Sequence, residues 1–156
     1  MRYTRVILHI TVVLVMMCSA NLAHAVGLLC TISSTPLDYG VYSFIQTTPN
    51  NSSGSITVSC VLSVSVSLSI TQGQSGSFAN RYMINGKNSD KLTYNLFLDS
   101  NRTKIFGDGT GGSYNYNALD ISLLSGQTVK VYGQIPAKQN IIPGSYSDEI
   151  AVELGF

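Results

Sequence analysis

The chain has 156 residues, with nine Lys and Arg, eight Asp and Glu, and a formal net charge of +1 at pH 7. Charged residues make up 11% of it, against about 25% in a typical soluble domain. This composition gives no electrostatic basis for binding nucleic acid or an anionic membrane surface. The length suits one domain with a hydrophobic core.

The first 25 residues have the features of a secretory signal peptide. Arg2 and Arg5 precede an apolar run over 6–17, and Ala-His-Ala at 23–25 supplies the small residues of a cleavage site. The apolar run is too short for a membrane span, so we expect export without stable insertion into a membrane. A cut after Ala20 is the main alternative to a cut after residue 25, and an uncleaved anchor is the other interpretation.

Removal of residues 1–25 would leave one domain over 26–156. Both histidines lie in the removed segment, and two cysteines remain, Cys30 and Cys60. In an exported protein such a pair is typical of a disulfide, which would stabilise the fold by about 3–4 kcal/mol in the chain-entropy model. Two free thiols or a metal site are the alternatives, although no histidine is left to complete a metal site.

The stretch ITVSCVLSVSVSLSIT, residues 56–71, shows the dominant pattern of this domain. Its even positions are apolar and its odd positions are Ser or Thr, except Val61. Strict alternation predicts a half-buried β-strand. Because strands usually have about 5–6 residues, we expect either two strands or one strand bent near residues 61–63.

Similar alternating segments recur between turn residues, and no helical period is found after residue 26. The other expected strands are 28–33, 39–44, 78–84, 92–98, 118–124, 127–135 and 145–156, with a loop at 46–54 and a glycine-rich loop at 107–117. Eight or nine short strands separated by turns predict an all-β, antiparallel sandwich.

The last expected strand is apolar along one face and ends the chain. The residues that share this face are Tyr146, Ile150, Val152, Leu154 and Phe156. An apolar terminal strand beside an open sheet edge can accept a strand from another chain. An ordinary internal strand is the alternative.

Catalytic chemistry is poorly supported, and we expect neither an enzyme nor a bound cofactor or metal. A Ser–His or Cys–His mechanism is excluded in residues 26–156 because they contain no histidine. GDGTGG, residues 107–112, matches G-x-G-x-x-G but precedes SYNYN, which is poor helix material. The same loop is rich in Gly, Ser, Asn and Tyr, as binding loops are, so Tyr114 and Tyr116 are candidates for a recognition surface.

Several motifs in order give the chain a resemblance to a known family. They are LDYGVY, GSITVSC, LTYNLFLD, FGDGTGG, VYGQIP and PGSYSDEIAVELGF, which span about residues 30–156. Together they resemble the spore coat protein U domain, the subunit type of archaic chaperone–usher pili.

The resemblance implies an immunoglobulin-like sandwich that is incomplete, lacking its final strand. A periplasmic chaperone would lend a strand, and another pilus subunit would replace it at the outer-membrane usher, so the chain would travel to the periplasm and then to the cell surface. It also implies a Cys30–Cys60 disulfide. Ile150, Val152, Leu154 and Phe156 would line the strand-acceptor groove or contact the chaperone.

The chain departs from a polymerising subunit of this family at one place. VGLL is all that separates the expected cut from Cys30, where a fibre-forming subunit carries a donor segment. We therefore expect a subunit that accepts a strand and does not donate one, as at a fibre tip or in a minor position. A self-contained β-sandwich that acts as a coat or carbohydrate-binding module is the alternative function.

Overall fold

The computed structural model describes residues 4–12 and 30–156. Apart from one 3-10 turn, η1 (Gly73–Ser75), the regular elements of these residues are β-strands. The strands are β1 (Thr4–Val12), β2 (Cys30–Thr35), β3 (Leu37–Tyr42), β4 (Asn50–Cys60), β5 (Val64–Ile70), β6 (Tyr82–Asn85), β7 (Lys91–Thr93), β8 (Asn95–Phe97), β9 (Tyr116–Ile121), β10 (Gly126–Ile135), β11 (Tyr146–Ser147) and β12 (Glu149–Gly155).

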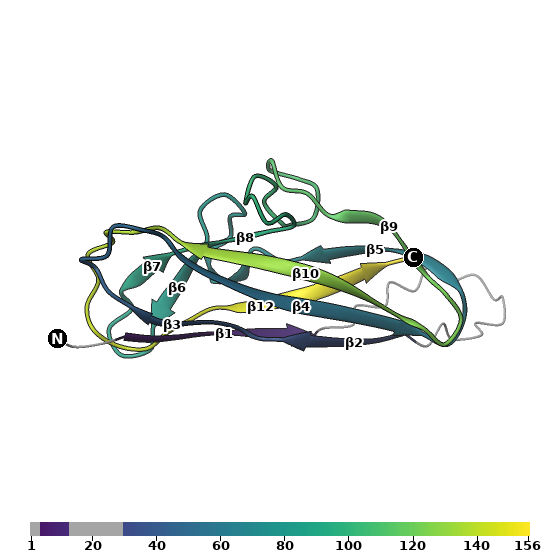
Figure 1. The fold of residues 1–156 in the computed structure, drawn as a ribbon, viewed down its shortest axis with the longest axis horizontal. Helices are drawn as coiled ribbons and strands as arrows, with labels where there is room; N and C mark the ends of the chain where they lie inside the picture. Colours follow the sequence, from purple (N-terminus) through teal and green to yellow (C-terminus); the bar gives the residue numbers. More distant parts are fainter. Residues whose placement is uncertain (1–3, 13–29) are drawn as a thin grey trace.

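The strands form two sheets that pack face to face (Figure 1). The smaller sheet has the order β2-β4-β10-β8. The larger sheet has eight strands in the order β7-β6-β11-β1-β12-β5-β9, with β3 paired to β1 as well. Most pairs are antiparallel, and the pairs of β1 with β11 and β12 are parallel. The all-β sandwich expected from the sequence is confirmed.

The long alternating stretch forms two strands, one in each sheet. β4 ends at Cys60 and β5 begins at Val64, so the chain crosses between the sheets where the alternation falters. The even positions are buried on both strands, for example Val58 and Leu68, which have no exposed surface. The odd positions carry hydroxyls, and Thr57 Oγ1 lies 2.9 Å from Thr128 Oγ1 of β10.

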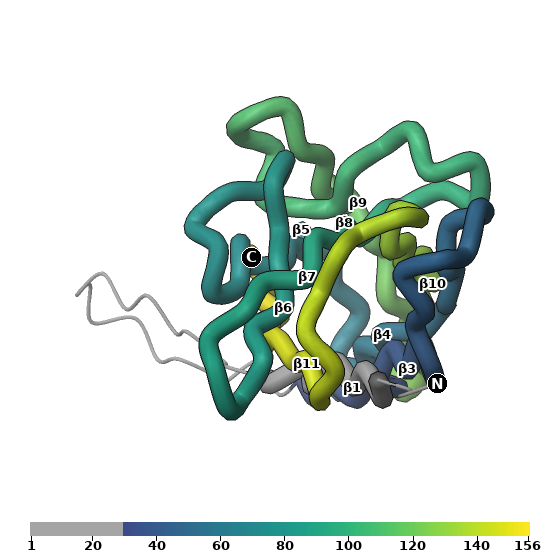
Figure 2. Tube along the Cα trace, turned by 90° about the vertical axis from the view of Figure 1, so that its left-hand side faces the viewer, coloured from purple at the N-terminus to yellow at the C-terminus, as the bar shows by residue number. Residues whose placement is uncertain are grey.

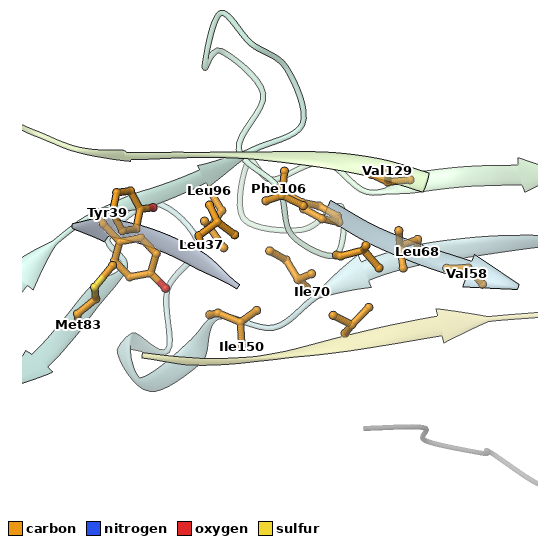
Figure 3. Packing of buried hydrophobic residues seen from close by; sticks show 14 of the residues in the cluster. Leu37, Tyr39, Val58, Leu68, Ile70, Met83, Leu96, Phe106, Val129 and Ile150 are labelled. Carbon is orange, nitrogen blue, oxygen red and sulfur yellow. The ribbon is translucent and has the colours of Figure 1, made fainter. Parts of the chain in front are cut away.

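The core between the sheets is made of these alternating apolar residues (Figure 3). Tyr39 and Met83 lie at one end of it, Val58 and Val129 lie at the other, and Ile150 of β12 points into its middle. Tyr39 and Tyr94 meet edge to face, with ring centroids 6.3 Å apart. Each face of the core therefore comes from one sheet, as in other sandwiches.

Cys30 and Cys60 form the expected disulfide. They are paired residues of the antiparallel strands β2 and β4, so the bond joins the first strand of the described domain to an inner strand of the smaller sheet. It closes a loop with a sequence separation of 30.

Several sequence-based boundaries were wrong. The expected strand 39–44 is β3, at 37–42, the expected strand 78–84 begins only at Tyr82, and 92–98 is divided into β7 and β8. Residues 50–54 were expected in a loop, but they belong to β4. They form a strand because β10 continues far enough for Ile135 to pair with Asn50. The expected strand 118–124 ends at Ile121. Leu123 and Leu124 lie exposed in a turn that is closed by a hydrogen bond from Ser125 N to Ser122 O, at 3.0 Å.

We predict that replacing both cysteines by serine in the full chain lowers the free energy of unfolding by about 3–4 kcal/mol, because the reduced unfolded chain regains the entropy of a loop of roughly 30 residues. Denaturant unfolding of the oxidised protein and the Cys30→Ser, Cys60→Ser variant measures the difference. A loss below about 1 kcal/mol would contradict the prediction.

Candidate strand-acceptor site

The last segment of the chain is divided into two strands at Asp148. β11 pairs with β6 before it, and β12 pairs with β5 after it. Ile150 and Val152 of β12 have no exposed surface. One edge of β12 is thus occupied by β5, and its other edge faces β1.

β3 forms the opposite side of this site. It is fastened to the neighbouring sheet by side chains, because Asn50 Nδ2 donates to the carbonyl of Tyr39 at 2.8 Å and Ser52 Oγ donates to that of Asp38 at 2.7 Å. Beyond these bonds, the hydroxyl of Tyr42 donates to the carbonyl of Pro136 at 3.0 Å. The backbone ladder of β3 is made with β1.

The strand position between β3 and the pair β11 and β12 is called the acceptor position here. In the full chain β1 occupies it, paired with β11 and β12 on one side and with β3 on the other. Figure 2 shows β11 on one side of this position and β3 on the other. Thr4 to Leu8 pair with β3, and His9 to Val12 pair with β12. These residues lie inside the segment that the sequence predicts to be removed. Within residues 30–156, no strand stands between the two edges.

Among the described residues, two of the four residues proposed from the sequence to line the acceptor lie in register with β1. Ile150 and Val152 are directly beside β1, in register with Ile10 and Val12. Leu154 is 9% exposed and pairs with Leu68 beyond the last β1 pair. Phe156 follows the end of β12 and is 67% exposed. From the alternation of apolar residues, the sequence analysis expected this strand to continue past Gly155 to Phe156.

Asp148 anchors the start of β12 from inside the core. Its carboxylate is 1% exposed and accepts three hydrogen bonds, from Tyr94 Oη at 2.7 Å, from the backbone N–H of Gln74 at 2.9 Å and from that of Glu149 at 2.8 Å. These donors replace the ladder bonds that are missing where the strand changes partner from β6 to β5. The carboxylate therefore fixes the edge that faces the acceptor position.

Gly73 makes room for this carboxylate. It has a φ of +65°, and a Cβ at this position would meet Asp148 Oδ2 and would lie 2.7 Å from Ile150 Cδ1. Both the positive φ and the close approach favour glycine. The turn η1 and β12 are therefore locked together at the start of the acceptor edge.

Arg81 lies fully buried beside this anchor. Its guanidinium donates to the carbonyl of Thr71 at 2.8 Å and to Asn95 Oδ1 at 3.0 Å. Burial lowers the pKa of Arg81, and the nearby Tyr94 and Asp148 oppose this shift. Burial, together with the Asp148 charge, raises the pKa of Tyr94 well above its usual value. Both Asp148 and Arg81 are engaged in holding strand ends, which is a structural role.

The sequence motif G-x-Y-x-D, over 144–148, is explained by these contacts. A Cβ at Gly144 would meet the side-chain amide of Asn85, and Tyr146 Oη donates to Asp90 Oδ2 at 2.6 Å. The bond with Tyr146 and the backbone N–H of Ile142 lower the pKa of Asp90. Sequence reasoning noted the motif without its role, because partners such as Tyr94 and Asn85 are more than 50 residues away along the chain.

The two tyrosines proposed for recognition are separated by their surroundings. Tyr114 is 51% exposed. Tyr116 begins β9 and lies partly buried, with its ring edge-on to Phe106 at a centroid distance of 6.3 Å. The loop before them is shaped by Asp108, whose Oδ1 accepts from the backbone N–H of Thr110 at 2.8 Å. Tyr114 is thus the more accessible of the two.

The described residues lack two further kinds of feature. Within 4–12 and 30–156, His, Cys, Asp and Glu form no group of three or more that could hold a metal ion. In the same residues no helix has the length and apolar character needed to cross a membrane.

We predict that Tyr94→Phe destabilises the full chain by about 1–3 kcal/mol, because a buried carboxylate oxygen loses its hydrogen-bond donor. Tyr82→Phe is the matched control, since the Tyr82 hydroxyl makes a longer bond of 3.2 Å to the Gln74 carbonyl near the surface; its cost should stay within about 0.5 kcal/mol. If denaturant unfolding gave the same loss of stability for Tyr94→Phe and Tyr82→Phe, the hydrogen bond from Tyr94 to Asp148 would not have the stabilising role assigned to it.

Comparison with known proteins agrees with this architecture. One relative is Protein U of Myxococcus xanthus, 30% identical over 109 residues that make up 66% of this chain and 59% of that protein. A similar solved structure is the CsuC–CsuE chaperone–tip adhesion subunit pre-assembly complex from the archaic chaperone–usher Csu pili of Acinetobacter baumannii. It has a TM-score of 0.55 and 22% identity over 81% of this chain and 39% of the other.

The chain therefore spans about three fifths of the length of Protein U and about two fifths of the Csu chain. At 22% identity the Csu likeness concerns the fold. The family is shown by a separate finding, because the model of the Spore Coat Protein U domain matches residues 17–153. The chain belongs to the Spore Coat Protein U domain family.

Proposed function

We propose that residues 26–156 are a structural subunit of a chaperone–usher type surface fibre, and that the subunit works by accepting a β-strand from another protein. The observation that carries this proposal is the acceptor position. Its two edges, β3 and β12, are bridged by residues that the sequence assigns to a removable signal peptide.

The physical basis is the backbone of these edges. A strand edge without a partner exposes N–H and C=O groups that can pair with any suitable strand. Here the buried face beside the edge also needs cover, because Ile150 and Val152 lose their neighbour when β1 is removed. A donated strand supplies both the backbone bonds and the apolar side chains.

The partners are proposed by analogy with the family and its relatives. The related Csu structure is a complex of a chaperone with a tip adhesion subunit. By analogy, a periplasmic chaperone fills the acceptor position after export, and a pilus subunit replaces it at the outer-membrane usher. The subunit would thus pass from the periplasm to the cell surface.

Two finer assignments stay predictions. A tip or minor position rests on the short VGLL segment before Cys30, which lies outside the described residues. A recognition role for the loop before β9 now rests mainly on Tyr114, because Tyr116 packs against Phe106. The alternative function, a self-contained coat or carbohydrate-binding sandwich, requires that the domain be complete without a partner.

The deciding experiment is the export of this protein into an oxidising periplasm, with and without a co-expressed chaperone of the archaic chaperone–usher type. We expect the mature chain to accumulate as a folded protein when the chaperone is present and to be degraded when it is absent. Accumulation alone, with a cooperative unfolding transition of about 5 kcal/mol or more, would favour the self-contained module.

We predict that Val152→Asp prevents formation of the chaperone complex, because it places a charge on the buried face beside the acceptor position, where an unpaired ion is strongly disfavoured. Ala151→Asp is the matched control, since Ala151 is the adjacent residue on the alternate, partly exposed face of β12. Co-purification with the chaperone measures both. Normal complex formation by Val152→Asp would contradict the proposal.

A further inference from the structure

We propose that Asp38 and Gly40 are positioning residues of the acceptor position: they preform a β-bulge in β3, so that the edge offered to a partner strand has its shape before that strand arrives. This inference rests on the proposed function, because it concerns the same acceptor position. It deepens that function by assigning the residues that prepare β3 and by defining the kind of strand that fits beside it.

The first support is a change of phase in the burial of β3. Leu37 and Tyr39 are buried at odd positions, whereas Tyr42 is buried at an even position and its neighbour Val41 is 50% exposed. A regular strand turns successive side chains to opposite faces, so it could not bury all three of these residues. One extra residue within the strand, which is a β-bulge, removes the conflict.

The second support is the backbone at Gly40. It has a φ of +63°, the left-handed conformation that glycine takes in one common type of β-bulge. The N–H of Gly40 donates to Asp38 Oδ1 at 2.7 Å, and this bond holds the bend locally. The pairing of β3 in the full chain agrees, since it passes from Asp38 to Gly40 and leaves out Tyr39.

The third support is the bonding of the carbonyl groups at the bulge. The carbonyl of Tyr39, the residue left out of the ladder, accepts from Asn50 Nδ2 at 2.8 Å. The carbonyl of Asp38 accepts from Ser52 Oγ at 2.7 Å. Both donors belong to β4, so the bulge is satisfied by residues of the domain itself and requires no bond from a partner strand.

A preformed edge lowers the cost of binding and selects the strand that binds. A segment that is fixed beforehand avoids the loss of affinity that ordering would bring. Because the ladder leaves out one residue of β3, the partner residues opposite Leu37 and Tyr42 are an even number of positions apart and lie on one face. The edge therefore suits a partner strand with uninterrupted alternation of apolar and polar residues and no bulge of its own.

The test uses the complex of the mature chain with a labelled, co-expressed chaperone of the archaic chaperone–usher type, whose release is followed after addition of excess unlabelled chaperone. In Gly40→Ala the added Cβ meets nothing within 4 Å, so the change adds strain at a positive φ. We expect release about tenfold faster than from the wild type. Gly40→Asn should stay within about threefold of the wild type, because Asn adopts this conformation more readily.

Gly112→Ala is the matched control for general strain. Gly112 has a φ of +78°, and an added Cβ there also meets nothing within 4 Å. It lies in the loop before β9, a strand that pairs with β5, so release should change by less than about twofold. Equal acceleration by Gly112→Ala and Gly40→Ala would overturn the inference, as would an unchanged rate in Gly40→Ala.

A second pair of variants tests the side-chain bond within the bulge. Asp38→Ala removes the acceptor of the Gly40 N–H and should speed release about fivefold. Asp38→Asn keeps an oxygen at this position and should restore most of the wild-type rate. If Gly40→Ala yields no complex while Gly40→Asn yields one, the inference is supported, whereas loss of the complex in both contradicts it.

These outcomes separate the inference from the proposed function. If the wild-type chain forms the chaperone complex and Gly40→Ala releases it at the wild-type rate, the fibre function stands and the positioning role falls. If the wild-type chain folds stably alone and binds no chaperone, the proposed function falls together with this inference.

Discussion

The rest of this structure depends on two strand edges whose backbone N–H and C=O groups need hydrogen-bond partners. Buried N–H and C=O groups must be hydrogen-bonded, and β3 and β12 both direct one edge into the space that a further strand fills. The larger sheet is continuous when that strand is present. Without it, β3 loses its backbone ladder and β12 keeps a neighbour on one side, so the remaining domain is a sandwich with a defined opening.

The two edges are fixed independently of what lies between them. β12 is held from inside by β5 and by the carboxylate of Asp148, which collects donors from Tyr94, Gln74 and Glu149. β3 is held by side chains of Asn50 and Ser52. These bonds do not involve β1. Both edges of the acceptor position are thus fixed by bonds made within residues 30–156.

Local alternation of apolar and polar residues predicted most of the strands. The strand boundaries that it predicted wrongly depend on contacts between distant parts of the chain. The alternation over 56–71 was sufficient to place β4 and β5, because period-two burial is a local property. The polar residues 50–54 form a strand because β10 pairs with them, which no local pattern reveals. Phe156 continues the apolar alternation, yet within the part of the chain that the structure describes no partner strand reaches it. The first strand was missed since an apolar N-terminal run fits a signal peptide equally well.

The site was predicted in the same uneven way. Ile150 and Val152, which the family resemblance proposed for the acceptor groove, lie in register with β1, and their role in binding a partner strand stays a prediction. The anchor of Asp148 was not found, because its donors Tyr94 and Gln74 lie 54 and 74 residues away from it along the chain. A carboxylate and an arginine in a chain with few charges were a signal that could have pointed to it, since buried ionisable residues need partners.

The hydroxyl-rich outer faces of β4 and β5 have a consequence for the environment in which the domain works. From residue 39 to residue 80 the sequence contains no charged side chain, and these residues include both strands. Cohesion there comes from apolar burial, backbone ladders and pairs such as Thr57 with Thr128. Dissolved ions weaken interactions between exposed charges. These strands carry no charged side chains, so they have no such interactions to weaken. The centre of the sandwich is therefore held together by forces that are largely indifferent to the ionic strength outside the cell.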